Sequence, residues 1–145
     1  MNRAEAWELL RETSQRWVDD EDGAVVWAGE FEGRWGVRMA QEVRDFTTVW
    51  FDVGDLTVGY EAYVLPAAPG DVGEVYRQCL IRNARSWRAH FSLDAEGSVY
   101  LTGRVPLDGL TAEVLDAALG ALYDMVETSF RGLLRAGFQA REKSP

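Results

Sequence analysis

The fold class is decided by residues 49–65, VWFDVGDLTVGYEAYVL. Apolar and aromatic side chains alternate with other residues on either side of Gly54-Asp55, which is typical of two extended strands. One side of this pair carries Val49, Phe51, Val53, Val58, Tyr60, Ala62 and Val64, and the other carries Phe46, Thr48, Trp50, Thr57, Glu61 and Tyr63. A two-residue Gly-Asp loop suits the hairpin turns that need positive φ. We therefore expect an antiparallel hairpin. Its second face mixes apolar and polar side chains, so another part of the protein or a partner could cover it.

The alternating pattern recurs on both sides of this hairpin. Further strands are expected near residues 25–27, 35–39, 90–93 and 98–105. In the first of them, Val25 and Trp27 should share one side, because side chains two residues apart in a strand point the same way. The last two strands should form a second hairpin around a type I turn at Asp94–Gly97.

Three helices are expected around the strands. A helix over about residues 3–18 is predicted by the helical spacing of Trp7, Leu10, Ser14 and Trp17. Helical spacing returns after Asp71 and after Thr111, and either side chain can cap the first turn of a helix. Gly137 suits a left-handed cap at the end of the last helix, and about residues 139–145 should form a frayed tail.

The second helix is distinguished by its charge. Its apolar stripe is expected to comprise Val72, Val75, Tyr76, Cys79, Leu80, Asn83 and Trp87. Ile81 and four arginines lie off this stripe, namely Arg77, Arg82, Arg85 and Arg88. The pattern predicts a helix with a cationic outer surface on an otherwise acidic chain.

These elements predict one α+β domain over residues 1–145. Their order is helix, three or four strands, helix, two strands, helix, or α-β-β-β-α-β-β-α if the first group has three strands. Hairpins dominate over parallel crossovers, so we expect an antiparallel sheet packed by helices. No internal repeat, low-complexity segment or linker divides the chain.

Composition narrows the function classes. The net charge of −9 disfavours binding that relies on neutralising nucleic-acid phosphates, and it disfavours contact with anionic membrane surfaces. Cys79 is the only cysteine, and the first residues lack the apolar core of a signal peptide. The sequence thus predicts a soluble cytoplasmic protein without a membrane span, with neither nucleic acid nor membrane as its partner.

No arrangement typical of catalysis stands out. Cys79 lies on an apolar stripe and is expected to be structural, and His90 stands alone at the start of a strand. Glu61 is placed in mid-strand, where pairing with an arginine is the expected role. No metal cluster, phosphate-binding glycine motif or other cofactor site is predicted. A small-molecule binder or enzyme with a pocket near Glu61 and His90 remains the alternative.

The aromatic content points to a binding surface. Six Trp and five Tyr are many for a chain of 145 residues. The candidate partner or dimer surface comprises Trp27, Trp35, Trp50, Tyr60, Tyr63 and Ile81 with Arg77, Arg82, Arg85 and Arg88. Alternation alone leaves open which aromatic residues face outward and which belong to the core. Exposed aromatic residues beside arginine are typical of a dimer interface or a peptide-binding surface.

Five stretches carry a resemblance to known proteins. They are EAYVLPA (61–67), EVY (74–76), LIRN (80–83), AHFSLD (89–94) and GSVYLTGRVPL (97–107). Over about residues 30–138 the chain resembles the YbjN domain family of bacteria, especially its actinobacterial members. The resemblance implies a fold like that of type III secretion chaperones, which are compact proteins that dimerise and bind extended protein segments. The acidic, Trp-rich N-terminal segment has no match in it.

We therefore expect a non-enzymatic protein-binding module, chaperone-like or regulatory, that acts as a homodimer and binds a protein or peptide segment. Nucleic-acid binding through the four arginines ranks last. The first 32 residues hold nine acidic residues against three arginines, a net charge of −6, whereas the remainder is near balance. A contact between acidic residues of one subunit and arginines of another is a further option.

Overall fold

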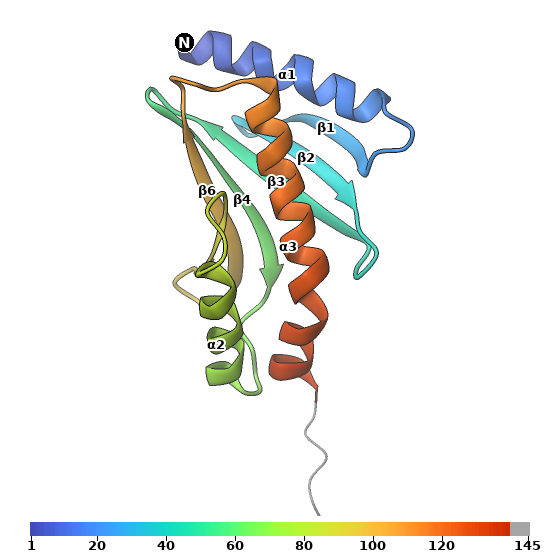
Figure 1. The fold of residues 1–145 in the computed structure, drawn as a ribbon, viewed down its shortest axis with the longest axis vertical. Helices are drawn as coiled ribbons and strands as arrows, with labels where there is room; N and C mark the ends of the chain where they lie inside the picture. Colours follow the sequence, from blue (N-terminus) through green and yellow to red (C-terminus); the bar gives the residue numbers. More distant parts are fainter. Residues whose placement is uncertain (140–145) are drawn as a thin grey trace, which may run out of the picture.

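A six-stranded antiparallel sheet with three helices on one face forms the fold in the computed structural model, which describes residues 1–139 (Figure 1). The elements are α1 (Arg3–Asp19), β1 (Val25–Phe31), β2 (Arg34–Ala40), β3 (Phe46–Val53), β4 (Thr57–Leu65), α2 (Val72–Asn83), β5 (His90–Leu93), β6 (Val99–Pro106) and α3 (Ala112–Phe138). The predicted α+β class is confirmed, and the first group has four strands. The predicted frayed tail lies, from residue 140 onward, outside the described residues.

The strands follow the order β1-β2-β3-β4-β6-β5, with every neighbouring pair antiparallel. The β3–β4 hairpin is confirmed, but the predicted Gly54-Asp55 turn is wrong, because the turn lies one residue later, at Asp55-Leu56, and has no positive φ. Val53 pairs with Val58, and the Gly54 N–H donates to the Thr57 carbonyl at 2.8 Å. The pairing of buried residues along both strands sets this register. The position of the turn follows from the register and not from the Gly-Asp pair.

A two-residue turn with positive φ occurs instead between β1 and β2. Phe31 pairs with Arg34, and the intervening Glu32 and Gly33 have φ values of 52° and 79°. These angles are those of the turn type that matches the twist of two antiparallel strands. The expectation that Val25 and Trp27 share one side is also wrong. A β-bulge between them moves Trp27 to the other face of the sheet.

The core lies between the sheet and the helices. Val37, Val49, Phe51 and Val58 contribute fully buried side chains from the sheet, and Leu10, Leu115, Leu122 and Leu133 contribute them from the helices. Two predicted caps are confirmed, because Asp71 accepts from the Glu74 N–H at 3.0 Å and Thr111 accepts from the Val114 N–H at 3.1 Å. The helices therefore begin where their side-chain caps place them.

Helix α2 is shorter than the predicted stripe. It ends at Asn83, whose side chain bonds to both backbone groups of Phe91, at 2.7 Å from the N–H and 3.1 Å from the carbonyl. These bonds turn the chain back toward β5. Trp87 consequently lies in the loop of residues 84–89 and is 76% exposed, and Leu80 is 67% exposed although the stripe placed both in the core.

Gly137 has a different role from the predicted left-handed cap. It lies inside α3, is buried, and accepts a hydrogen bond from the Gly70 N–H at 2.9 Å. A Cβ atom at this position would lie 2.8 Å from the Cβ of Ala68 and 3.0 Å from Val75. Glycine is therefore needed here for the close approach of two segments.

Candidate functional site

The sheet has one face that no helix covers. All three helices contact the other face or one another, as Figure 1 shows from the helix side. Strand registers place six aromatic side chains on the uncovered face, namely Trp27, Phe31, Phe46, Trp50, Tyr63 and Tyr100. Each is exposed or half-buried, and we call this surface the open face.

Two indole rings lie against the backbone of the open face. Gly36 is paired with both Gly29 and Trp50. A Cβ atom on Gly36 would lie 2.7 Å from Cζ3 of Trp50 and 2.9 Å from Cζ3 of Trp27, and one on Gly29 would lie 2.8 Å from Trp27. The glycines therefore leave a shallow trough in which the two rings rest.

Arginine side chains hold these rings in place. The Arg38 guanidinium lies 5.7 Å from the ring centre of Trp27 and 5.8 Å from that of Phe46, and it donates to Thr48 Oγ1 at 3.2 Å. The Arg34 guanidinium lies 5.5 Å from the ring centre of Trp50. Such cation–π contacts order exposed aromatic rings without burying them.

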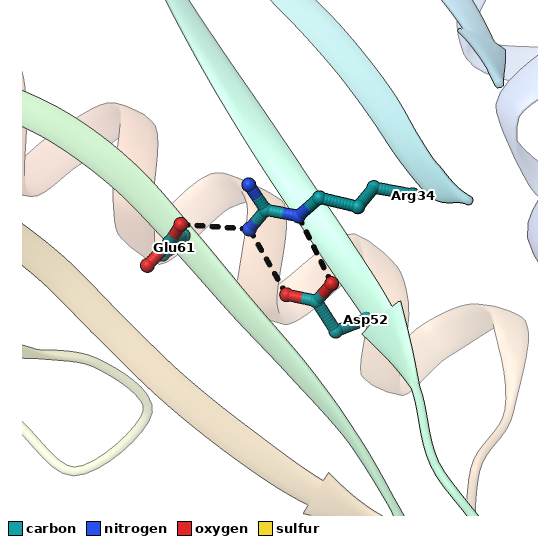
Figure 2. Close-up of polar contacts among 3 residues, drawn as sticks. All are labelled: Arg34, Asp52 and Glu61. Carbon is teal, nitrogen blue, oxygen red and sulfur yellow. Dashed lines mark hydrogen bonds and ion pairs between the residues drawn. The ribbon is translucent and has the colours of Figure 1, made fainter. Parts of the chain in front are cut away.

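Arg34 also joins three strands through ion pairs, shown in Figure 2. Its Nε and Nη2 atoms donate to the two carboxylate oxygens of Asp52, each at 2.9 Å, and Nη2 donates to Glu61 Oε1 at 2.7 Å. Burial alone would lower the pKa of Arg34, but the hydrogen bonds and charges of the two carboxylates outweigh it and raise the pKa. The predicted pairing of Glu61 with an arginine is confirmed.

The structure divides the predicted surface. Trp27, Trp50 and Tyr63 lie on the open face, whereas Trp35 and Tyr60 point to the helix side. Trp35 is half-buried below α1, where its Nε1 donates to Ser14 Oγ at 2.8 Å. Tyr60 is 3% exposed, and its hydroxyl donates to the Arg88 carbonyl at 2.5 Å. Both therefore belong to the packing of the domain. Alternation shows which side chains share a face, but it does not show which face the helices cover.

The remaining predicted residues form a second surface. Arg77, Ile81 and Arg82 lie on α2, and Arg85 and Arg88 lie in the loop of residues 84–89 rather than on the helix. Sequence reasoning omitted Phe31, Phe46 and Tyr100 from the candidate surface. Phe46 could have been included, since it alternates in phase with Trp50. Phe31 could not, because it follows the bulge that reverses the phase of β1.

Glu61 and His90, the residues of the alternative small-molecule or enzyme site, do not line one pocket together. Glu61 and His90 both pair with Thr102, so they lie in one row of the open face with β6 between them. Glu61 bonds to Arg34, and His90 Nε2 lies 3.0 Å from the Ser86 carbonyl. A shallow hollow of about 380 Å³ borders Glu61 and does not include His90 among its lining residues.

Cys79 is a buried free cysteine. Burial raises the pKa of its thiol to about 11, against a smaller lowering by the charge of Arg82. The neutral thiol is a poor nucleophile, which agrees with a packing role. In residues 1–139, no helix is both long enough and apolar enough to cross a lipid bilayer.

Comparison with known proteins places the fold. Residues 15–135 match the family model of YbjN, described as "Putative bacterial sensory transduction regulator". The type III secretion chaperone SycH of Yersinia pestis, solved in complex with a stable fragment of YscM2, is similar with a TM-score of 0.55 and 14% identity, over 83% of this chain and 96% of that one. YbjN from E. coli is similar with a TM-score of 0.53 and 14% identity, over 81% and 86% of the two chains.

Two mycobacterial proteins are similar in sequence, and both are uncharacterised. One from Mycobacterium tuberculosis is 34% identical over 88 residues, or 61% of this chain and 48% of its own length. One from Mycobacterium leprae is 33% identical over 104 residues, or 72% and 56%. The chain thus spans about half the length of these relatives.

Proposed function

The chain belongs to the YbjN family, and from this premise we propose that it is a non-enzymatic protein-binding module, chaperone-like or regulatory, that acts as a homodimer in the cytoplasm. The observation that carries the proposal is the open face, where six aromatic rings and two arginines lie on a sheet face without a covering helix. The structural similarity to SycH, a chaperone solved with a bound protein fragment, supports the same class of function.

The open face has the size of one side of a protein interface. Five strands about 25 Å long and the shorter β5, spaced about 4.8 Å apart, give a face of roughly 600 Å² before side-chain relief is counted. This area is close to the roughly 800 Å² per partner of a standard complex. Aromatic residues and arginine are the types that carry most binding energy in such interfaces. Their ordering by Arg34 and Arg38 reduces the entropy that a partner must remove.

The geometry favours a partner segment that is flat or extended and rich in apolar side chains. The rings of Trp27 and Trp50 lie against the backbone at Gly29 and Gly36, so they offer apolar surface at the level of the sheet. Arg34 already has two carboxylate partners, whereas Arg38 has no carboxylate within 4 Å in residues 1–139 and is available to an acidic side chain of the partner.

Peptide selection on the intact chain tests the proposal. Peptides selected from a random display library on the wild-type chain should lose binding to Trp27→Ala/Trp50→Ala, because these variants remove the ring platform. They should keep binding to Trp87→Ala, which removes a more exposed tryptophan from the other surface. Equal binding to both variants would contradict assignment of the open face, and sedimentation equilibrium showing a monomer at all concentrations would contradict the homodimer.

A further inference from the structure

A pocket of about 330 Å³ lies away from the open face, between α3 and the loop of residues 84–89. The end of α2 contributes Arg82, the loop contributes Arg85, Trp87 and Arg88, and α3 contributes Asp124 and Met125. Nothing in the proposed protein-binding role uses this pocket. Its volume lies at the lower end of the range for small-molecule sites.

Three cations in this pocket are locally uncompensated. In the part of the chain that the structure describes, Arg82, Arg85 and Arg88 have no carboxylate within 4 Å, although the chain as a whole carries 24 acidic residues. Other arginines, such as Arg34 and Arg77, do have such partners. Asp124 is the one acidic residue in the pocket lining. Three positive charges and one negative charge therefore leave the pocket suited to an anion.

The loop that presents these side chains has a fixed backbone. The Tyr60 hydroxyl donates to the Arg88 carbonyl at 2.5 Å, and the same carbonyl packs where a Cβ atom on Gly103 would stand, 2.3 Å away. Ser86 donates to the Ala89 carbonyl, and its own carbonyl lies 3.0 Å from His90 Nε2. These bonds fix the backbone from which Trp87 and Arg88 reach the pocket.

Trp87 adds an exposed aromatic platform. Its side chain is 76% exposed, and the Arg88 guanidinium lies 4.1 Å from the centre of its ring. The contact stiffens the indole in a position where it remains open to solvent. An exposed planar ring beside unpaired arginines combines a stacking surface with forked hydrogen-bond donors, which suit phosphate oxygens.

We propose that this pocket binds a nucleotide. The phosphates contact Arg82 and Arg85, the base stacks on Trp87, and Asp124 accepts a hydrogen bond from a sugar hydroxyl or an exocyclic amine. An acidic peptide would use the cations but leave the exposed Trp87 ring beside them unexplained. The protein would then carry two separate binding surfaces, the open face for a protein segment and this pocket for a nucleotide.

Isothermal titration calorimetry of the full chain with ADP, pyrophosphate and adenosine tests this site. We expect ADP to bind with a Kd below about 1 mM and more tightly than either fragment, because both halves of the pocket contribute. Arg82→Gln/Arg85→Gln should weaken the binding of ADP and of pyrophosphate by at least about tenfold, since the loss of one charge-assisted hydrogen bond already costs about that much affinity. Trp87→Ala should weaken ADP by about tenfold through lost stacking and leave pyrophosphate unchanged.

The charge-matched control is Arg77→Gln/Arg104→Gln, which removes two exposed arginines outside the pocket lining and should leave every titration unchanged. Circular dichroism of each variant reports whether it is folded. Absence of ADP binding at about 1 mM overturns the proposal. Unchanged ADP binding by Trp87→Ala also overturns it, because that result indicates a site for anions only. Tighter binding of a thymidine oligonucleotide than of ADP overturns it as well, because that result indicates a nucleic-acid surface.

Discussion

The indole ring of Trp50 lies directly on the backbone of Gly36, its cross-strand partner, and a Cβ atom on Gly36 would stand 2.7 Å from Cζ3 of the ring. Gly36→Ala should therefore displace Trp50 and the neighbouring Trp27. We expect a loss of about 1–3 kcal/mol in the free energy of unfolding, as for other overpacked sites, and weaker peptide capture. Urea denaturation followed by near-ultraviolet circular dichroism measures both the loss and the ring displacement.

Gly59→Ala is the matched control, since Gly59 is on the same face and its Cβ would meet only the Gly103 carbonyl, at 4.0 Å. Its stability should stay within about 0.5 kcal/mol of wild type, as for most surface changes. Equal losses in the two variants would show that the trough is not what constrains Gly36.

Arg34→Ala should leave Asp52 and Glu61 facing each other without a cation. Because all three side chains are partly exposed, we expect a loss of only about 1 kcal/mol in the free energy of unfolding. Adding Glu61→Gln should cost less in the Arg34→Ala background than in the wild type, because it removes a like-charge contact there. Chemical denaturation of the double-mutant cycle measures this difference, and strict additivity of the two changes would contradict it.

Tyr60→Phe should release the loop of residues 84–89. The substitution removes the donor to the Arg88 carbonyl while keeping the ring in the core, so we expect a loss of about 1 kcal/mol in stability. Hydrogen–deuterium exchange should rise in residues 84–89 with little change in the sheet. Tyr63→Phe, on the open face, serves as the control and should leave that exchange unchanged.

Cys79 should make stability depend on alkaline pH. Burial raises its pKa from 9.0 to about 11, so the folded chain favours the neutral thiol. This contribution is complete below the unfolded pKa near 9.0 and is lost as the pH rises through about 11. The free energy of unfolding of wild type relative to Cys79→Ala should fall across this interval, as thermal or urea denaturation can measure. A difference that stays constant with pH would show that the thiol titrates normally.

Alternation and helical spacing were sufficient for the fold class, because they report which side chains within one element share a face. Val49, Phe51 and Val53 were therefore predicted to share one side, which is the core side in the structure, and Asp71 and Thr111 were predicted as caps from the residues that follow them. The caps depend on contacts within three residues, so no distant segment is needed to predict them.

Features that depend on distant segments were not predictable in this way. The bulge before Trp27 reversed the phase of β1, and the helix α1 turned Trp35 from a surface candidate into a packing residue. Gly137 fitted a helix end, yet the packing of Ala68 against it is what requires glycine.

Patterns within single segments were sufficient for an antiparallel α+β domain, two of its helix caps and a high content of aromatic residues. Only the tertiary structure decided that Trp27 and Trp50 meet above Gly36 while Arg82, Arg85 and Trp87 gather in a separate pocket. The physical reason is that periodicity is a property of one segment, whereas exposure depends on which other segments pack against it.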